Sequence, residues 1–168
     1  MQADIAGAIR VVSRARAFEW TWAQTDIDRF CLDVGWTLLE RGDYGRTSLS
    51  TDLTVNFNRA DAYRNRRHIR GRTGRDESLE RVTAYITDLT RDVTPALTAA
   101  LSDHFDQLAE RLTRDLGSPN HIESKPGAEI GWEYPDVVIN VVTHNRCLLL
   151  EIVNPRRWKE RRADQDSD

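Results

Sequence analysis

The chain has 168 residues, of which 39% are hydrophobic and 30% are charged, and its formal net charge is −3. These values are typical of one soluble globular domain, and no apolar run approaches the ~18 residues that a membrane span requires. The N-terminal residues lack the basic and then apolar regions of a secretory signal, so we expect a cytoplasmic protein with no membrane partner. Two cysteines, Cys31 and Cys147, are too few for a disulfide framework and are expected to be buried free thiols.

One segment differs in charge from the rest of the chain. Residues 59–75 contain seven arginines and a single acid, Asp61, so this segment carries +6 and the remainder of the chain −9. An acidic body favours association with a basic partner, for example a toxin that degrades nucleic acid.

Two helices are predicted near the N-terminus. Asp4 can cap the first, which runs to about Ala17 with apolar residues at helical spacing. The second begins at Thr25 and ends at Gly35. Its apolar residues fall at i, i+3, i+4 and i+7: Ile27, Phe30, Cys31 and Val34.

The polar residues of the second helix predict two further features. Thr25 and Asp28 form an imperfect capping box, since glutamate or glutamine is the usual second member. Asp26, Asp28 and Asp33 lie opposite the apolar stripe, so we expect all three on a solvated face.

Three aromatic residues, Phe18, Trp20 and Trp22, alternate with polar residues in the link between these helices. Their spacing places the three rings on one side of an extended segment. One interpretation is that the rings close the end of the core, and the other is that Trp20 and Trp22 form an exposed anchor for a partner. The sequence leaves both open.

From residue 36 the apolar period changes from helical to two-residue, which predicts strands. We expect a strand over 36–41, a turn over 42–45, and one bent strand or two short ones over 46–57. A further strand over 81–89 alternates apolar with polar residues and leads into a long helix.

The segment between these strands is the least regular part of the chain and is expected to be a long hairpin loop, with one strand near 63–69. Arginines beside Tyr63 and His68 can neutralise phosphates while the rings stack on bases, as in a nucleic-acid-binding arm. A solvated, flexible loop is the alternative. Five arginines are candidate partner-binding residues: Arg64, Arg66, Arg67, Arg70 and Arg72.

The long helix, over about residues 94–116, is the clearest element of the sequence. Thr94 suits the N-cap, Pro95 the first helical position, and Gly117 the C-terminal end. One face carries an apolar stripe that needs a sheet or another helix to cover it: Leu97, Leu101, Phe105, Leu108, Leu112 and Leu116.

The remaining chain predicts a three-stranded antiparallel meander over about 128–153. Its last two strands are apolar on both faces, so one face should be covered by the long helix and the other at least in part. Trp158 is expected to fold back onto the sheet, and residues 161–168 to form a disordered tail. The fold class is therefore α+β: one domain over 1–160 with two N-terminal helices, an antiparallel sheet and a central helix packed on it.

Motifs that carry chemistry are absent from the sequence. It contains no GxSxG, P-loop, HExxH or CxxC pattern, and its four histidines are dispersed. Asp103, His104 and Asp106 form the one dense cluster of acids and imidazole, on a largely polar helix flank. We therefore expect a binding protein without catalytic residues, metal or cofactor.

A set of aromatic residues, glycines and turns resembles an actinobacterial domain family of unknown function, over about residues 10–160. The set comprises Phe18, Trp20, Trp22, Asp26, Phe30, Gly35, Trp36, the strand 81–89, residues 116–119, Trp132, Asn154, Pro155 and Trp158. The sequence departs from the family pattern in the basic insertion between Phe57 and Arg81.

Small cytoplasmic domains of this kind resemble immunity proteins of secreted polymorphic toxins, which need a rigid, charge-complementary surface and no active site. The resemblance therefore implies a protein partner, either a cognate toxin or a secreted client. Two alternatives stay open: a nucleic-acid-binding module that uses residues 59–75, and a secretion chaperone, which would be a homodimer with an exposed apolar groove.

Overall fold

The computed structural model describes residues 1–42, 45–64, 77–124 and 127–165. The helices in this part of the chain are α1 (Ile5–Ala17), α2 (Asp26–Val34), α3 (Pro95–Leu116) and α4 (Pro155–Gln165). The strands are β1 (Thr37–Arg41), β2 (Arg46–Ser50), β3 (Arg59–Arg64), β4 (Leu79–Tyr85), β5 (His121–Glu123), β6 (Glu129–Glu133), β7 (Val138–His144) and β8 (Cys147–Val153). The α+β class, the two N-terminal helices and the long central helix are confirmed.

The described strands form one antiparallel sheet in the order β1-β2-β3-β4-β8-β7-β6-β5. The sheet consists of two four-stranded meanders, which meet where β4 pairs with β8 and Thr83 lies opposite Glu151. Each meander follows a helix, since α1 and α2 precede β1 and α3 precedes β5. The topology therefore repeats, although the sequence shows no internal repeat.

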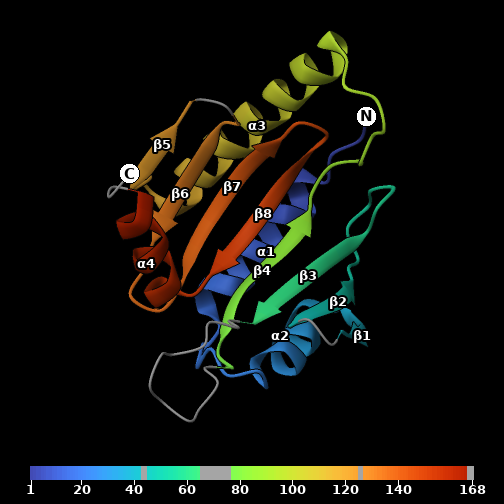
Figure 1. The fold of residues 1–168 in the computed structure, drawn as a ribbon. Coiled ribbons are helices and arrows are strands. Elements are labelled where there is room, and N and C mark those ends of the chain that lie inside the picture. Colours follow the sequence, from blue (N-terminus) through green and yellow to red (C-terminus); the bar gives the residue numbers. More distant parts are fainter. Residues whose placement is uncertain (43–44, 65–76, 125–126, 166–168) are drawn as a thin grey trace.

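The helices divide between the two faces of the sheet (Figure 1). α1 and α3 lie on one face, and α4 lies on the other, over the half of the sheet that contains β5 to β8. The main core lies between the sheet and the first of these layers. The predicted stripe of α3 is buried there from Leu97 to Leu112, and Leu116 is packed against its edge.

Three of the predicted helices begin or end where their sequence signals indicate. The Asp4 carboxylate accepts a hydrogen bond from Gly7 N at 2.8 Å and so caps α1. The Thr94 hydroxyl accepts from Leu97 N at 3.1 Å and caps α3. Gly35 ends α2 with φ of 78°, a left-handed conformation that glycine adopts without steric cost.

The predictions for the start of α2 were wrong in two respects. Thr25 makes no side-chain capping hydrogen bond, so the capping box does not form. Asp26, expected on a solvated face, is completely buried. Its carboxylate accepts hydrogen bonds from the backbone N–H groups of Thr21 and Trp22, both at 2.7 Å, and pairs with Arg29 at 2.7 Å. The link before α2 folds back onto this carboxylate, which removes it from water.

The aromatic link between α1 and α2 belongs to the core. Trp22 is 8% exposed, and Phe18 and Trp20 pack against the core cluster. The rings of Trp20 and Trp22 stack with centroids 4.5 Å apart. Their indole N–H groups donate to backbone oxygens, Trp20 to Ala15 and Trp22 to Asp136. Of the two interpretations of these rings, the structure shows the one in which they close the end of the core.

Other segments differ from the sequence predictions. Residues 51–57 form turns rather than a strand, and β5 adds a fourth strand to the C-terminal meander. Trp158 does fold back onto the sheet, but within a helix: residues 161–165, expected in a disordered tail, belong to α4. The arginine-rich residues 65–76 lie outside the described residues, as do 166–168.

Both cysteines are buried free thiols, as expected. Burial raises the pKa of Cys31 and of Cys147 to about 11, so both thiols are protonated at neutral pH. In the part of the chain that the structure describes, no helix has the length and apolarity to cross a bilayer.

Candidate functional site

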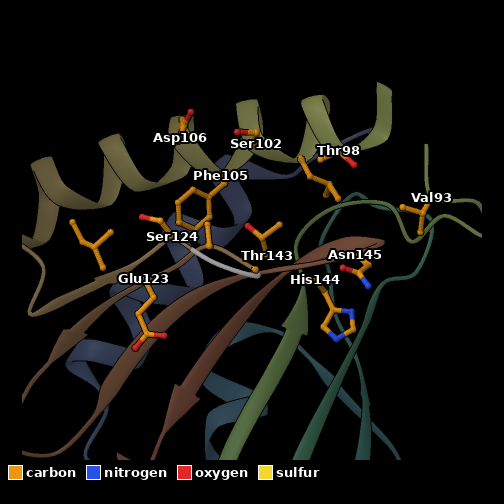
Figure 2. A pocket seen from close by; sticks show the side chains of 14 residues that line it. Val93, Thr98, Ser102, Phe105, Asp106, Glu123, Ser124, Thr143, His144 and Asn145 are labelled. Carbon is orange, nitrogen blue, oxygen red and sulfur yellow. The ribbon is translucent and has the colours of Figure 1, made fainter. Parts of the chain in front are cut away.

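A groove of about 480 Å³ lies between the N-terminal half of α3 and the strands β5 to β7 (Figure 2). Phe105 points from α3 into the groove, and Ser124 and Thr143 lie opposite it. A volume of this size lies in the range of pockets that hold a ligand or the side chains of a partner. We call this feature the α3–β5 groove.

The floor of the α3–β5 groove is continuous with the core, whereas its walls are exposed. Leu101 and Phe105 are 2% and 8% exposed, so the groove bottom is made by the buried stripe of α3. Ile122 on β5 is 64% exposed and Val93, before α3, is 60% exposed. A large aliphatic side chain that stays this exposed beside a core floor is typical of a binding surface.

Few charged side chains line the α3–β5 groove. Asp106 is exposed on α3, whereas the Glu123 carboxylate pairs with Arg162 at 2.8 Å. No lysine or arginine is among the described residues that line the groove. The Thr143 hydroxyl is buried in the wall and has no hydrogen-bond partner among the described residues. The groove therefore offers apolar contact, one hydroxyl without a partner among the described residues, and the exposed carboxylate of Asp106.

The open side of the α3–β5 groove is an edge of the sheet. β5 pairs with β6, and no strand among the described residues pairs with its outer side. Its backbone groups on that side are free to bind an added strand. Strand alternation places Ile122 on the groove side of β5, whereas the side chains of His121 and Glu123 lie on the opposite face, with α4.

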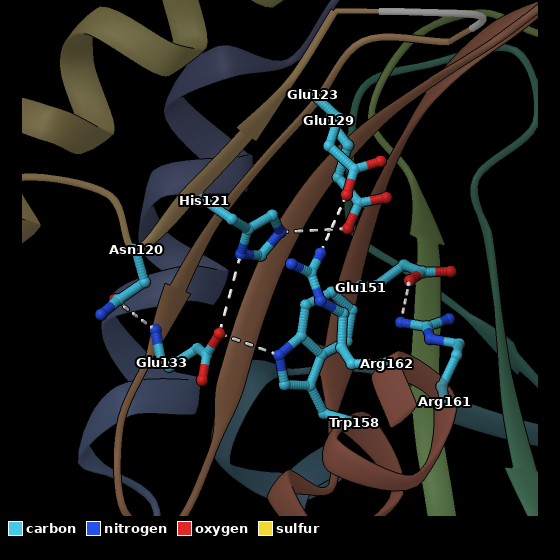
Figure 3. Close-up of polar contacts among 9 residues, drawn as sticks. All are labelled: Asn120, His121, Glu123, Glu129, Glu133, Glu151, Trp158, Arg161 and Arg162. Atoms are coloured by element: carbon cyan, nitrogen blue, oxygen red, sulfur yellow. Dashed lines mark hydrogen bonds and ion pairs between the residues drawn. The ribbon is translucent and has the colours of Figure 1, made fainter. Parts of the chain in front are cut away.

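The α4 side of β5 is held by a dense polar network (Figure 3). The rings of His121 and Trp158 stack with centroids 4.8 Å apart. His121 Nε2 lies 3.1 Å from Glu129 Oε1, and Trp158 Nε1 donates to Glu133 Oε1 at 3.0 Å. Arg162 pairs with Glu123 at 2.8 Å. These contacts fix both β5 and α4, and so position one wall of the α3–β5 groove.

The amino-acid sequence over residues 6–154 matches the model of a family of unknown function, DUF6301. The chain belongs to this family. The match covers α1 to β8, and α4 follows it. No curated protein and no solved structure matches the chain.

None of the described residues that were predicted to bind a partner lines the α3–β5 groove of this DUF6301 domain. Trp20 and Trp22 pack in the core. Arg64 ends β3 beside Gln24; with the amide oxygen of Gln24 turned toward it, Arg64 Nε and Nη1 donate at 3.0 and 2.9 Å. Arg66, Arg67, Arg70 and Arg72 lie outside the described residues.

The acid and imidazole cluster of α3 shows no arrangement for a metal ion. Asp103 and Asp106 are exposed, and His104 is half-buried beside them. Among all described residues, no group of three or more histidines, cysteines or acids is placed to hold a metal. The arrangement that stands out among the described residues is the α3–β5 groove, with its apolar floor and exposed aliphatic walls.

Proposed function

We propose that this protein is a non-enzymatic protein-binding domain, an immunity protein that neutralises a cognate secreted toxin by direct binding through the α3–β5 groove. The observation that carries the proposal is an exposed apolar groove, with Asp106 at its rim, beside a sheet edge with which no described strand pairs. The membership of a family without assigned chemistry is compatible with this role.

The shape of the α3–β5 groove favours a protein segment as its ligand. The exposed Ile122 and Val93 extend the apolar surface beyond the floor made by Leu101 and Phe105, with Ile122 at the edge of the sheet and Val93 at the end near the β7–β8 turn. An extended segment that adds to β5 satisfies the free backbone groups of this edge while its side chains enter the groove. A small molecule would leave that edge uncovered.

The charge of the groove favours a basic partner. Asp106 is exposed at its rim, and no lysine or arginine is among the described lining residues. The net charge of the whole chain is also negative. Complementary charge accelerates encounter and excludes acidic competitors, while the buried apolar contacts supply the affinity.

A pull-down from the organism that produces the protein tests the proposal. We expect the tagged wild-type protein to retain one protein at about 0.5 M salt, where exposed charges are strongly screened. Ile122→Asp should weaken this binding at least ~30-fold, about 2 kcal/mol, because it places a charge in the apolar contact. Leu32→Asp is the matched control, since Leu32 is 86% exposed on α2, outside the groove; this variant should retain the partner.

Co-expression then tests the class of partner. The recovered protein alone should arrest growth of a test strain, and wild type or Leu32→Asp should restore growth where Ile122→Asp does not. A partner that is not toxic contradicts the immunity role. Equal retention by wild type and Ile122→Asp contradicts the α3–β5 groove as the binding site.

A further inference from the structure

The sheet has a second exposed surface, on the face opposite α1 and α3. No described helix lies over β2, β3 and β4 on this side (Figure 1). Residues directly opposite on neighbouring strands share a face, and the register aligns Ser48, Asp61, Thr83 and Glu151 in one row across four strands. We call this row and its neighbours on the same face the open sheet face.

Aromatic rings and arginines flank this polar row. On one side the register aligns Arg46, Tyr63 and Arg81, with the Arg81 guanidinium 4.7 Å from the centre of the Tyr63 ring. On the other side strand alternation places Arg59 and Tyr85. Both tyrosines are half-buried rather than enclosed, so part of each ring is open to solvent.

Phe57 extends the aromatic surface beside β4. Its ring meets Tyr85 edge-on, with centroids 4.8 Å apart, and the residue is 36% exposed. Burial raises the pKa of Tyr63 and of Tyr85 above the usual value for a phenol, so both stay neutral at physiological pH. These rings therefore present no negative charge to an incoming phosphate.

The polar row itself carries groups for hydrogen bonding. Asp61 is 6% exposed and accepts from Arg46 Nε at 2.7 Å and from Ser48 Oγ at 3.2 Å. The Glu151 side chain is 12% exposed and lies 3.9 Å from Arg81 Nη1. The Thr83 hydroxyl and Arg81 Nε are buried without a hydrogen-bond partner among the described residues. A buried polar atom in this state needs a partner, which an ordered water or a ligand can supply.

We propose that the open sheet face binds single-stranded nucleic acid, with unstacked bases on Tyr63 and Tyr85 and phosphates on Arg46, Arg59 and Arg81. A sheet that carries aromatic rings on an uncovered face is a common platform for unpaired bases. The arginines neutralise the backbone, and the carboxylates are already held in ion pairs, which reduces their repulsion of a phosphate. Carboxylates and hydroxyls can also accept from the amino groups of base edges.

This binding is independent of the α3–β5 groove, because it uses the other half of the sheet and its opposite face. It overlaps in part with the nucleic-acid-binding module predicted over residues 59–75, since Arg59 and Tyr63 belong to that segment, whereas Arg46, Arg81 and Tyr85 do not. A substitution can therefore abolish binding at the α3–β5 groove without affecting the open sheet face, and the reverse also holds.

Fluorescence anisotropy with labelled 12-nucleotide single-stranded RNA and DNA tests the proposal on the full chain. We expect binding at 50 mM salt, and an affinity about 7- to 20-fold lower at 200 mM, as two or three phosphate contacts predict. Tyr85→Ala should weaken binding at least ~5-fold through loss of stacking, whereas Tyr85→Phe, which keeps the ring, should retain it. Arg59→Ala should weaken binding and reduce its salt dependence.

The controls separate this surface from the others. Ile122→Asp in the α3–β5 groove should leave oligonucleotide binding unchanged, and circular dichroism should show that each variant is folded. The proposal is overturned if no oligonucleotide binds at 50 mM salt. It is also overturned if folded Tyr85→Ala and Arg59→Ala bind as tightly as wild type, because binding would then lie elsewhere in the chain.

Discussion

Asp26 organises the link between α1 and α2. Trp22, to whose N–H it is hydrogen-bonded, is the one non-glycine residue with positive φ in the described part of the chain, at 58°. Such a conformation is uncommon and persists where the surroundings hold it. The carboxylate thus turns the link so that Trp22 enters the core and stacks on Trp20.

Asp26→Asn should lower the free energy of unfolding by about 2–3 kcal/mol, because it weakens charge-assisted hydrogen bonds to two backbone N–H groups and Arg29 in a buried site. Urea unfolding measures this loss. Asp33→Asn is the control on the same helix: Asp33 is more exposed, and its pair with Arg14 is 3.6 Å long, so the change should be under ~0.5 kcal/mol. Equal stability of the two variants would contradict the structural role of Asp26.

Helical spacing in the sequence places Asp26 on the polar side of α2. It does not show that the preceding link covers this side at the first turn of the helix. Helical spacing indicates which residues share a face, and Asp28 and Asp33 are exposed as that pattern predicts. The burial of Asp26 depends on a preceding link that reverses direction at Trp22. Neither the positive φ nor the reversal has a sequence signal, since tryptophan is not a turn residue.

At the level of elements, α4 has one buried apolar residue, Trp158, that packs on the sheet. Trp158 is 4% exposed and forms a small cluster with Val138 and Val153, apart from the main core. It also stacks on His121 and donates to Glu133. The rest of α4 is strongly polar, and a helix of 11 residues has little stability by itself in water.

Trp158→Ala should therefore undock α4 without unfolding the sheet, because a Trp→Ala change costs about 3–5 kcal/mol and an isolated helix of this length cannot offset it. Hydrogen exchange followed by mass spectrometry should show fast exchange over residues 157–165 and unchanged protection of β7 and β8. Arg162→Ala, which removes an exposed ion pair, should leave α4 protected. Protection of α4 in Trp158→Ala would show that other contacts hold the helix.

The elements that the sequence predicted best are those with a repeating pattern. α3 has six apolar residues on one face together with a cap at its start and a glycine at its end, so its bounds followed from local rules. β5 has three residues and α4 has one large apolar residue, Trp158, so neither shows a period. Both elements form through contacts with residues distant in the sequence.

For the whole molecule, the repeated meanders create one sheet with two different exposed regions. α1 and α3 cover one face, and the sheet ends at β5 beside α3, where the α3–β5 groove opens (Figure 1). The uncovered part of the other face, over β2 to β4, carries the aromatic and arginine rows. A rigid scaffold with separate surfaces suits a binding protein.

The fold class followed from the order of helical and alternating segments, but the candidate site did not. In the sequence, nothing distinguishes Phe105 from the other apolar residues of the α3 stripe, and Ile122 is a single apolar residue between polar neighbours. Thr143 belongs to a strand that the sequence predicts to be covered on both faces. The groove exists because β5, the start of β6 and the β7–β8 turn leave the N-terminal half of α3 partly uncovered. These segments are brought together by tertiary contacts, and no local sequence pattern predicts their proximity.

Hydrogen-exchange footprinting of the complex with the recovered partner tests whether the α3–β5 groove is the binding site. We expect the partner to slow exchange over residues 98–106 of α3 and over residues 121–124, which comprise β5 and Ser124, and to leave α1, α2 and the β2–β4 part of the sheet unchanged. New protection at the edge strand β5 would indicate that the partner adds a strand there. Protection confined to other segments, with the α3–β5 groove exchanging as in the free protein, would contradict the account.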